Sequence, residues 1–233
     1  MGTATRATGT GRRAGLDHDE VVAHALALVE TGGAAALTMR KLAADLDVTT
    51  TTIYWHVGGR DELVRAVIER VAEQTAGIAI DGSTPNERVM SVARAVWRTA
   101  IEHRNVTALA HQVGATGVLE LHLERAMARE LEAGGLRGAE VRDALRAILM
   151  CVAGFLVVAF RSDGGSQALH GSADGRDDLD VDGLAPETVT AMAERPDLPA
   201  LFDRTVQAVV DSFLDHPGGP AAPGRPTRRR TAR

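Results

Sequence analysis

The segment that decides the fold is residues 38–60, TMRKLAADLDVTTTTIYWHVGGR. Thr38 and Thr49 are each placed to cap the start of a short helix, because a threonine hydroxyl accepts a hydrogen bond from a free helix amide. A break falls at Asp47-Val48, and Gly58-Gly59 ends the second helix. The segment therefore predicts two short helices joined by a tight turn, which is the helix-turn-helix plan.

The side chains of this segment divide into an apolar set and a polar set. The polar set, which includes four consecutive threonines, forms hydrogen bonds but carries little charge, and Arg40, Lys41 and Arg60 flank it. Such groups suit contact with bases and phosphates. The pattern favours a DNA-reading surface, and the alternative is a polar helix pair with no such role. The predicted shared core comprises Leu42, Ala43, Leu46, Val48, Ile53 and Val57.

Helical spacing continues on both sides of this segment, so the sequence predicts an all-α protein. Upstream, Asp17 and Glu20 start a helix that ends at Gly32-Gly33. Downstream, Thr84-Pro85-Asn86-Glu87 is a strong start signal for a second helical unit. The expected helices beyond the segment cover 61–78, 85–103, 106–113, 118–133, 139–160, 186–195 and 198–214.

Composition excludes several classes of protein. The chain has 233 residues, of which 45% are hydrophobic and 24% charged, the balance of an ordinary globular protein. A single cysteine, Cys151, excludes a disulfide scaffold and a four-cysteine zinc site. The apolar run Ala147–Phe160 is too short to span a bilayer and predicts a buried helix. The arginines near the N-terminus precede no apolar stretch, so we expect no secretory signal and a cytoplasmic protein.

Charge is distributed unevenly along the chain. The net charge is −5, yet residues 1–16 carry +3, residues 216–233 carry +5 and residues 17–215 carry −13. Two basic tails on an acidic body favour local attraction to a polyanion. The predicted organisation is a flexible basic arm at 1–16, a helix-turn-helix domain at 17–60, a helical ligand-binding and dimerisation domain at 61–215 and a disordered basic tail at 216–233. Within the third part, 61–78 is a linking helix and 161–185 a mobile loop.

The run LTMRKLAADLDVTTTTIYWHVGGRDEL, residues 37–63, resembles the DNA-binding signature of TetR-type transcriptional regulators. The chain departs from that signature at Asp47, where the family usually has glycine in the turn. Aspartate tolerates a left-handed backbone better than most residues, so the turn is expected to survive. We expect an exposed Tyr54 and a partly buried Trp55. The resemblance implies DNA contacts by Arg40, Thr50, Thr51, Thr52, Tyr54, Trp55, His56 and Arg60.

The resemblance also implies a homodimer, formed through the helices near 139–160 and 198–214, that binds double-stranded, pseudo-palindromic operator DNA and an unknown small-molecule effector. Among the residues themselves, no metal-ligand pair with a plausible partner stands out, so we expect no metal site, no cofactor and no membrane partner. The alternatives are an activator, a protein-sensing regulator without a small ligand, and an enzyme that contains a helix-turn-helix. Against the enzyme, the sequence has no P-loop, nucleophile elbow or HExxH motif. The candidate effector-binding residues are Trp97, His111, Met127, Met150 and Phe155.

Overall fold

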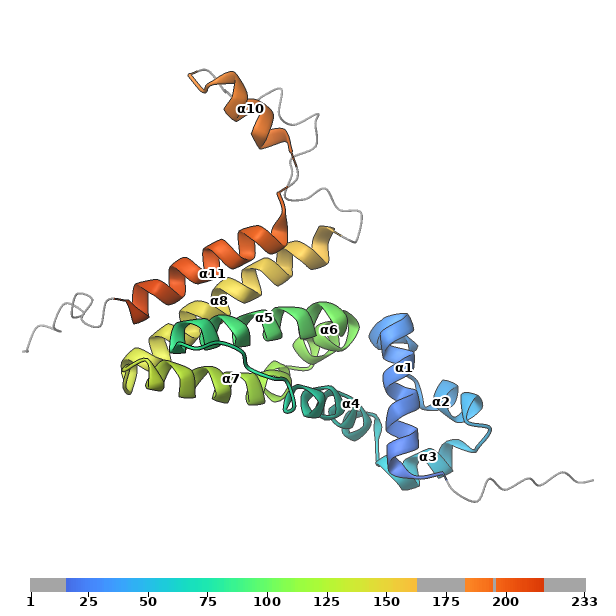
Figure 1. Cartoon of the computed structure of the whole chain (residues 1–233). Coiled ribbons are helices and arrows are strands. Elements are labelled where there is room, and N and C mark those ends of the chain that lie inside the picture. The colour runs from blue at the N-terminus through green and yellow to red at the C-terminus, as the bar shows by residue number, and fades with distance from the viewer. Residues whose placement is uncertain (1–15, 163–182, 195, 216–233) are drawn as a thin grey trace, which may run out of the picture. The chain divides into compact units, whose positions relative to one another are not determined.

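The computed structural model describes residues 16–162, 183–194 and 196–215 (Figure 1). The described residues form helices and no strand, which confirms the predicted all-α class. The helices are α1 (His18–Ala36), α2 (Met39–Asp45), α3 (Thr50–Val57), α4 (Arg60–Thr75), α5 (Pro85–Glu102), α6 (Arg104–Gln112), α7 (Thr116–Ala133), α8 (Ala139–Ser162), α10 (Pro186–Ala193) and α11 (Leu198–Leu214).

The chain divides into two compact units. The first contains the described residues of Met1–Glu73 together with Asn105–Leu119, and the second contains those of Gln74–Arg104 and Glu120–Arg233. Most of α4 and α6 thus lie in the first unit, with α1, α2 and α3. The sequence analysis placed the boundary between a DNA-binding domain and a ligand-binding and dimerisation domain at residue 60. The assignment of these roles to the two parts stays a prediction.

The first unit is built around the core that the sequence predicted for the helix-turn-helix. Leu42, Ala43, Leu46, Ile53 and Val57 are buried, and Val48 packs against them partly buried. The same core takes in apolar residues of α1, α4 and α6. The two short helices therefore gain their stability from tertiary packing, as helices of this length must.

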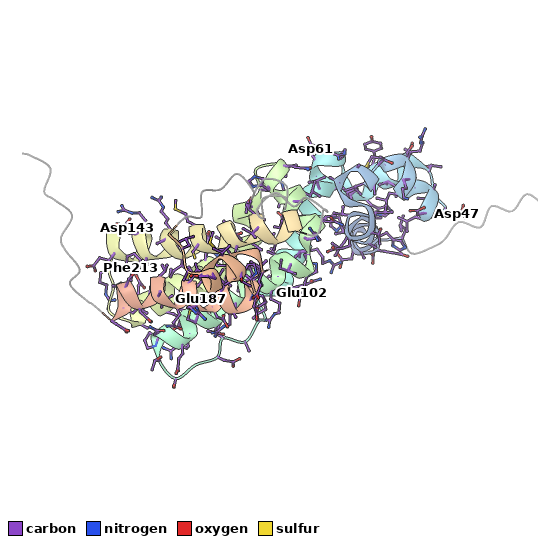
Figure 2. All side chains as sticks on the ribbon, turned by 90° about the horizontal axis from the view of Figure 1, so that it is seen from above. Asp47, Asp61, Glu102, Asp143, Glu187 and Phe213 are labelled. Atoms are coloured by element: carbon purple, nitrogen blue, oxygen red, sulfur yellow. The ribbon has the colours of Figure 1, made fainter. Side chains whose placement is uncertain are left out.

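Side chains and backbone define the ends of the two short helices. The Thr38 hydroxyl accepts from the Lys41 amide at 3.1 Å, and the Thr49 hydroxyl accepts from the Thr52 amide at 3.2 Å. Asp47 has a φ of 54°, so the expected left-handed turn is confirmed. Asp47 lies at the edge of the first unit (Figure 2). Gly58, with a φ of 71°, ends α3.

The second unit packs α5, α7, α8 and α11 around one core. The predicted capping box starts α5: Thr84 accepts from the Glu87 amide, and the Glu87 carboxylate accepts from the Thr84 amide. Hydrogen bonds from Ser83 and Thr84 lower the pKa of the Glu87 carboxyl to about 2. The start of α8 and the end of α11 lie at the same end of this unit, so the two helices run antiparallel (Figures 1 and 2).

Polar contacts fix α5 against its neighbours in this unit. Arg88 Nε donates to Glu130 Oε2 of α7 at 2.6 Å, and Arg94 Nε donates to Asp203 Oδ1 of α11 at 2.8 Å. Near the other end of α11, Asn86 Nδ2 donates to Asp211 Oδ1 at 2.8 Å. These contacts set the register of α5 on α11.

Helix α8 corrects the expectation of a buried helix. One face is buried, through Ala144, Ile148 and Val152, but Met150 is 73% exposed and Val157 50% exposed. Within the described residues, Ala139–Phe160 is the one stretch whose length and composition would allow it to cross a membrane. Its buried face packs against α5 and α11, so in this structure it is a half-buried helix of a bundle.

Several predictions concern segments outside the described residues. These are the basic arm at 1–16, of which only Leu16 is described, most of the loop at 161–185, and the basic tail at 216–233. Helix α8 continues to Ser162, past the predicted start of the loop, and α10 ends at Ala193 rather than near 195.

Candidate DNA-binding surface

Helix α3 exposes its large aromatic side chains. Tyr54 is 51% exposed, as expected, whereas Trp55 is 85% exposed and the prediction of a partly buried Trp55 is wrong. The reason is helical geometry. Ile53 and Val57 are buried one turn apart, and Trp55 lies midway between them, about 200° around the helix from Ile53. The spacing of the buried residues already carried this signal.

The four threonines divide into two pairs with different roles. Thr49 and Thr52 lie at the start of α3 and bond to each other through their hydroxyl oxygens at 3.0 Å. Thr50 and Thr51 are exposed, and Thr52 is only partly so. A run of poor helix formers is tolerated here because one member is the cap and the others lie in the first turn.

Basic side chains are also exposed on the two helices that precede and follow α3 in the chain. Arg40 of α2 and Arg60 of α4 are both exposed, and His56 is partly exposed. The Glu62 carboxylate is engaged locally, since its Oε2 accepts from the Gly59 amide at 3.0 Å. The surface formed by α3 and its flanks thus combines hydroxyls, two aromatic rings and guanidinium groups, which suits contact with phosphates and base edges.

The candidate effector residues are brought together only in part. Trp97 and Phe155 meet in the second unit with ring centroids 6.1 Å apart. Phe202, which the sequence analysis did not select, completes the cluster at 4.9 Å from Trp97 and 5.5 Å from Phe155. The sequence signal that could have pointed to Phe202 was its position on the apolar face of the last helix. We call Trp97, Phe155 and Phe202 the aromatic cluster.

The other three candidates lie elsewhere. Met127 is fully buried in the core of the second unit, Met150 is 73% exposed, and His111 is exposed in the first unit. Among the residues that the structure describes, no group of three or more His, Cys, Asp or Glu is placed to hold a metal ion.

Comparison with known proteins relates the segment that carries this surface to a known family. Residues 21–67 match the family model described as bacterial regulatory proteins of the tetR family. That range contains α2, α3 and the turn at Asp47. The resemblance to the TetR family is thereby confirmed, and the helix-turn-helix described above is the part of the chain that carries it.

Individual relatives extend the likeness beyond this domain. An HTH-type transcriptional regulator of Saccharopolyspora erythraea is 27% identical over 139 residues, which are 60% of this chain and 59% of the relative. The chain thus matches a little over half of that relative's length. The relative is named as a regulator rather than as an enzyme.

Several solved structures, among them a TetR family protein, share the fold across most of the chain. ActR of Streptomyces coelicolor, in complex with actinorhodin, is 22% identical with a TM-score of 0.61 and covers 87% of this chain and 98% of its own. BioQ of Mycobacterium smegmatis is 27% identical with a TM-score of 0.61 and covers 87% of this chain and 99% of its own. A second BioQ structure holds its double-stranded DNA operator.

Proposed function

We propose that this chain is a DNA-binding transcriptional regulator, acting as a homodimeric repressor that a small molecule releases from its operator. The observation that carries the proposal is the surface of α3, where Tyr54 and Trp55 stand exposed among threonines, between Arg40 and Arg60. Two large aromatic side chains exposed next to each other are typical of a surface that a partner covers. The match of residues 21–67 to the tetR family model and the operator-bound BioQ structure support DNA as that partner.

The dimer is supported by the exposed face of α8. Met150, Ala153 and Val157 are exposed and follow the spacing of a helix–helix seam, since the first and the last are seven positions apart. On the adjacent α11, Leu201 and Ala208 are also exposed and seven residues apart. We propose that this pair of helices packs against the same pair of a second copy. A two-fold dimer then presents two α3 helices to half-sites spaced about 34–36 Å apart.

The effector site is proposed at the aromatic cluster of the second unit. Three aromatic rings from α5, α8 and α11 meet there, so a ligand that inserts between them would move three helices at once. The actinorhodin-bound ActR structure supports a small molecule as the effector class. Release then requires a coupling free energy of about 1–3 kcal/mol between effector and DNA, which changes affinity about 5–150-fold. Such a regulator works beside the chromosome, in the cytoplasm.

The test is selection of DNA by the pure protein. Random genomic fragments are incubated with the protein, retained fragments are sequenced, and a shared inverted repeat is expected. The matched control is the Tyr54→Ala/Trp55→Ala double variant, which alters no buried side chain and should retain no shared sequence. Retention of unrelated fragments by both proteins, at low salt only, would show non-specific polyanion binding and overturn the proposal.

A further inference from the structure

Two adjacent residues of the chain cap the C-terminal ends of two helices, one in each unit. Arg104 belongs to the second unit and Asn105 to the first. A helix leaves the carbonyls of its last turn without intrahelical donors, so each such end needs a donor from elsewhere. This dipeptide supplies one donor to each unit.

Asn105 fills this role for α1. Its Nδ2 donates to the carbonyl oxygen of Glu30 at 2.7 Å in a partly buried setting. Helical geometry is interrupted at Gly33, whose φ is 67°, so Glu30 lies in the last turn before the break. Val106 and Leu109, which follow on α6, are buried in the same core as α1, and they hold Asn105 in place.

Arg104 fills the same role for α8. Its Nη2 donates to the carbonyl oxygen of Phe160 at 3.2 Å, and its guanidinium carbon lies 5.2 Å from the centroid of the Phe160 ring. Helix α8 ends at Ser162, so this carbonyl is one of the last four. A cation is also favoured at the negative end of the helix dipole, and stacking on the ring adds to the attachment.

We propose that the Arg104–Asn105 dipeptide is the junction through which a change in the second unit reaches the DNA-binding helices, an inference that takes its regulatory meaning from the proposed function. The two residues share a peptide bond, so displacement of the end of α8 moves Arg104 and therefore Asn105. Asn105 in turn holds the end of α1, and α1 packs against α3. Coupling of this kind is reciprocal, so a change at α1 must also reach α8.

The test is hydrogen exchange measured by mass spectrometry on the full chain, with neither DNA nor effector present. Arg104→Ala, which removes the cap of α8, should speed exchange in residues 28–36 of the first unit as well as at the end of α8. Asn105→Ala should speed exchange in residues 152–160 of the second unit as well as in α1. Loss of one hydrogen bond predicts exchange about fivefold faster in the affected turns.

Matched controls remove a polar contact inside one unit and away from the junction. Arg70→Ala breaks the contact of Arg70 with Asp19 in the first unit, and Arg94→Ala breaks the contact with Asp203 in the second. Each control should change exchange only in its own unit. If the exchange changes caused by Arg104→Ala and by Asn105→Ala are each limited to the unit that contains the substitution, the proposal is overturned.

A second pair of variants covers loss of folding. If circular dichroism shows that either alanine variant is unfolded, Arg104→Lys and Asn105→Asp are measured instead. Both keep a side chain of similar size, but Arg104→Lys loses the planar guanidinium group and Asn105→Asp loses the amide donor. Failure of the proposed function can be distinguished from failure of this proposal. A wild-type protein that retains no DNA sequence overturns that function, whereas exchange effects that cross between units depend on no DNA.

Discussion

Both units leave large apolar side chains exposed, but the neighbours of those side chains differ. On α3, Tyr54 and Trp55 stand among hydroxyl groups with arginines on either side. On α8, Met150 and Val157 stand along a seam of small and aliphatic residues, with Ala153 and Gly154 between them. An exposed hydrophobic residue therefore identifies its partner only together with its surroundings. Hydrogen-bonding and cationic neighbours fit a nucleic acid, and an aliphatic seam fits another helix surface.

The largest expected effect breaks the seam on α8. Val157→Arg places a charge where the proposed dimer would bury it unpaired, at about 3–5 kcal/mol for such a charge. Analytical ultracentrifugation should find a dimer for the wild type and a monomer for the variant. The control is Leu121→Arg, a charge at an exposed position of α7, which should leave the dimer intact. A Val157→Arg variant that still sediments as a dimer would place the interface elsewhere.

The second effect tests the aromatic residues of α3. Trp55→Ala and Tyr54→Ala should each weaken binding to the selected DNA by about 1–3 kcal/mol, because each ring is expected to contact DNA directly. Titration of labelled DNA by fluorescence anisotropy measures the loss. Because the Trp55 side chain buries so little surface, the Trp55→Ala variant should unfold at the same midpoint as the wild type. Leu121→Ala, which truncates an exposed side chain of the second unit, is the control. Unchanged affinity in both variants would remove the rings from the reading surface.

The third effect is a pH dependence that belongs to the second unit. Burial, and after it the Glu124 carboxylate, raises the pKa of Glu120 from 4.5 to about 7. The folded state thus favours the protonated acid, and this contribution is complete below pH 4.5 and lost as the pH rises through 7. Allowing for solvent screening, the wild type should lose about 1–2 kcal/mol of unfolding free energy between pH 5 and pH 8 relative to Glu120→Gln.

Urea unfolding at the two pH values measures this difference. Glu132→Gln, at an exposed position of the same helix, is the matched control and should follow the wild type. Parallel pH profiles for the wild type and Glu120→Gln would contradict the raised pKa.

The smallest effect concerns the turn of the first unit. Asp47 adopts a φ of 54°, where a side chain is strained and glycine is not. Asp47→Gly should raise the unfolding free energy by about 0.5–1 kcal/mol, since part of the relief is offset by the greater entropy of glycine in the unfolded chain. Asp47→Ala should lower it. Denaturant midpoints check both, and a stabilising alanine would show that no strain resides at this turn.

Local signals in the sequence predicted the elements well where the structure depends on neighbouring residues. The caps at Thr38, Thr49 and Thr84, and the left-handed turn at Asp47, involve residues at most five positions apart and were predicted correctly. Exposure of Trp55 was predictable from its spacing to Ile53 and Val57, and the error came from assuming that a large aromatic residue must be buried. The predicted roles of the DNA-contact residues stay predictions.

By itself, the sequence determined the helices, the turn and the chemistry of α3, because short-range hydrogen bonds and helical periodicity decide these features. The tertiary structure decided which distant residues meet. It brought Phe202 to Trp97 and Phe155, left Met150 exposed, and placed His111 in the other unit. It also gave Arg104 and Asn105 partners 56 and 75 positions away. Such contacts depend on how helices pack, and no local pattern of residue types encodes the packing partner of a side chain.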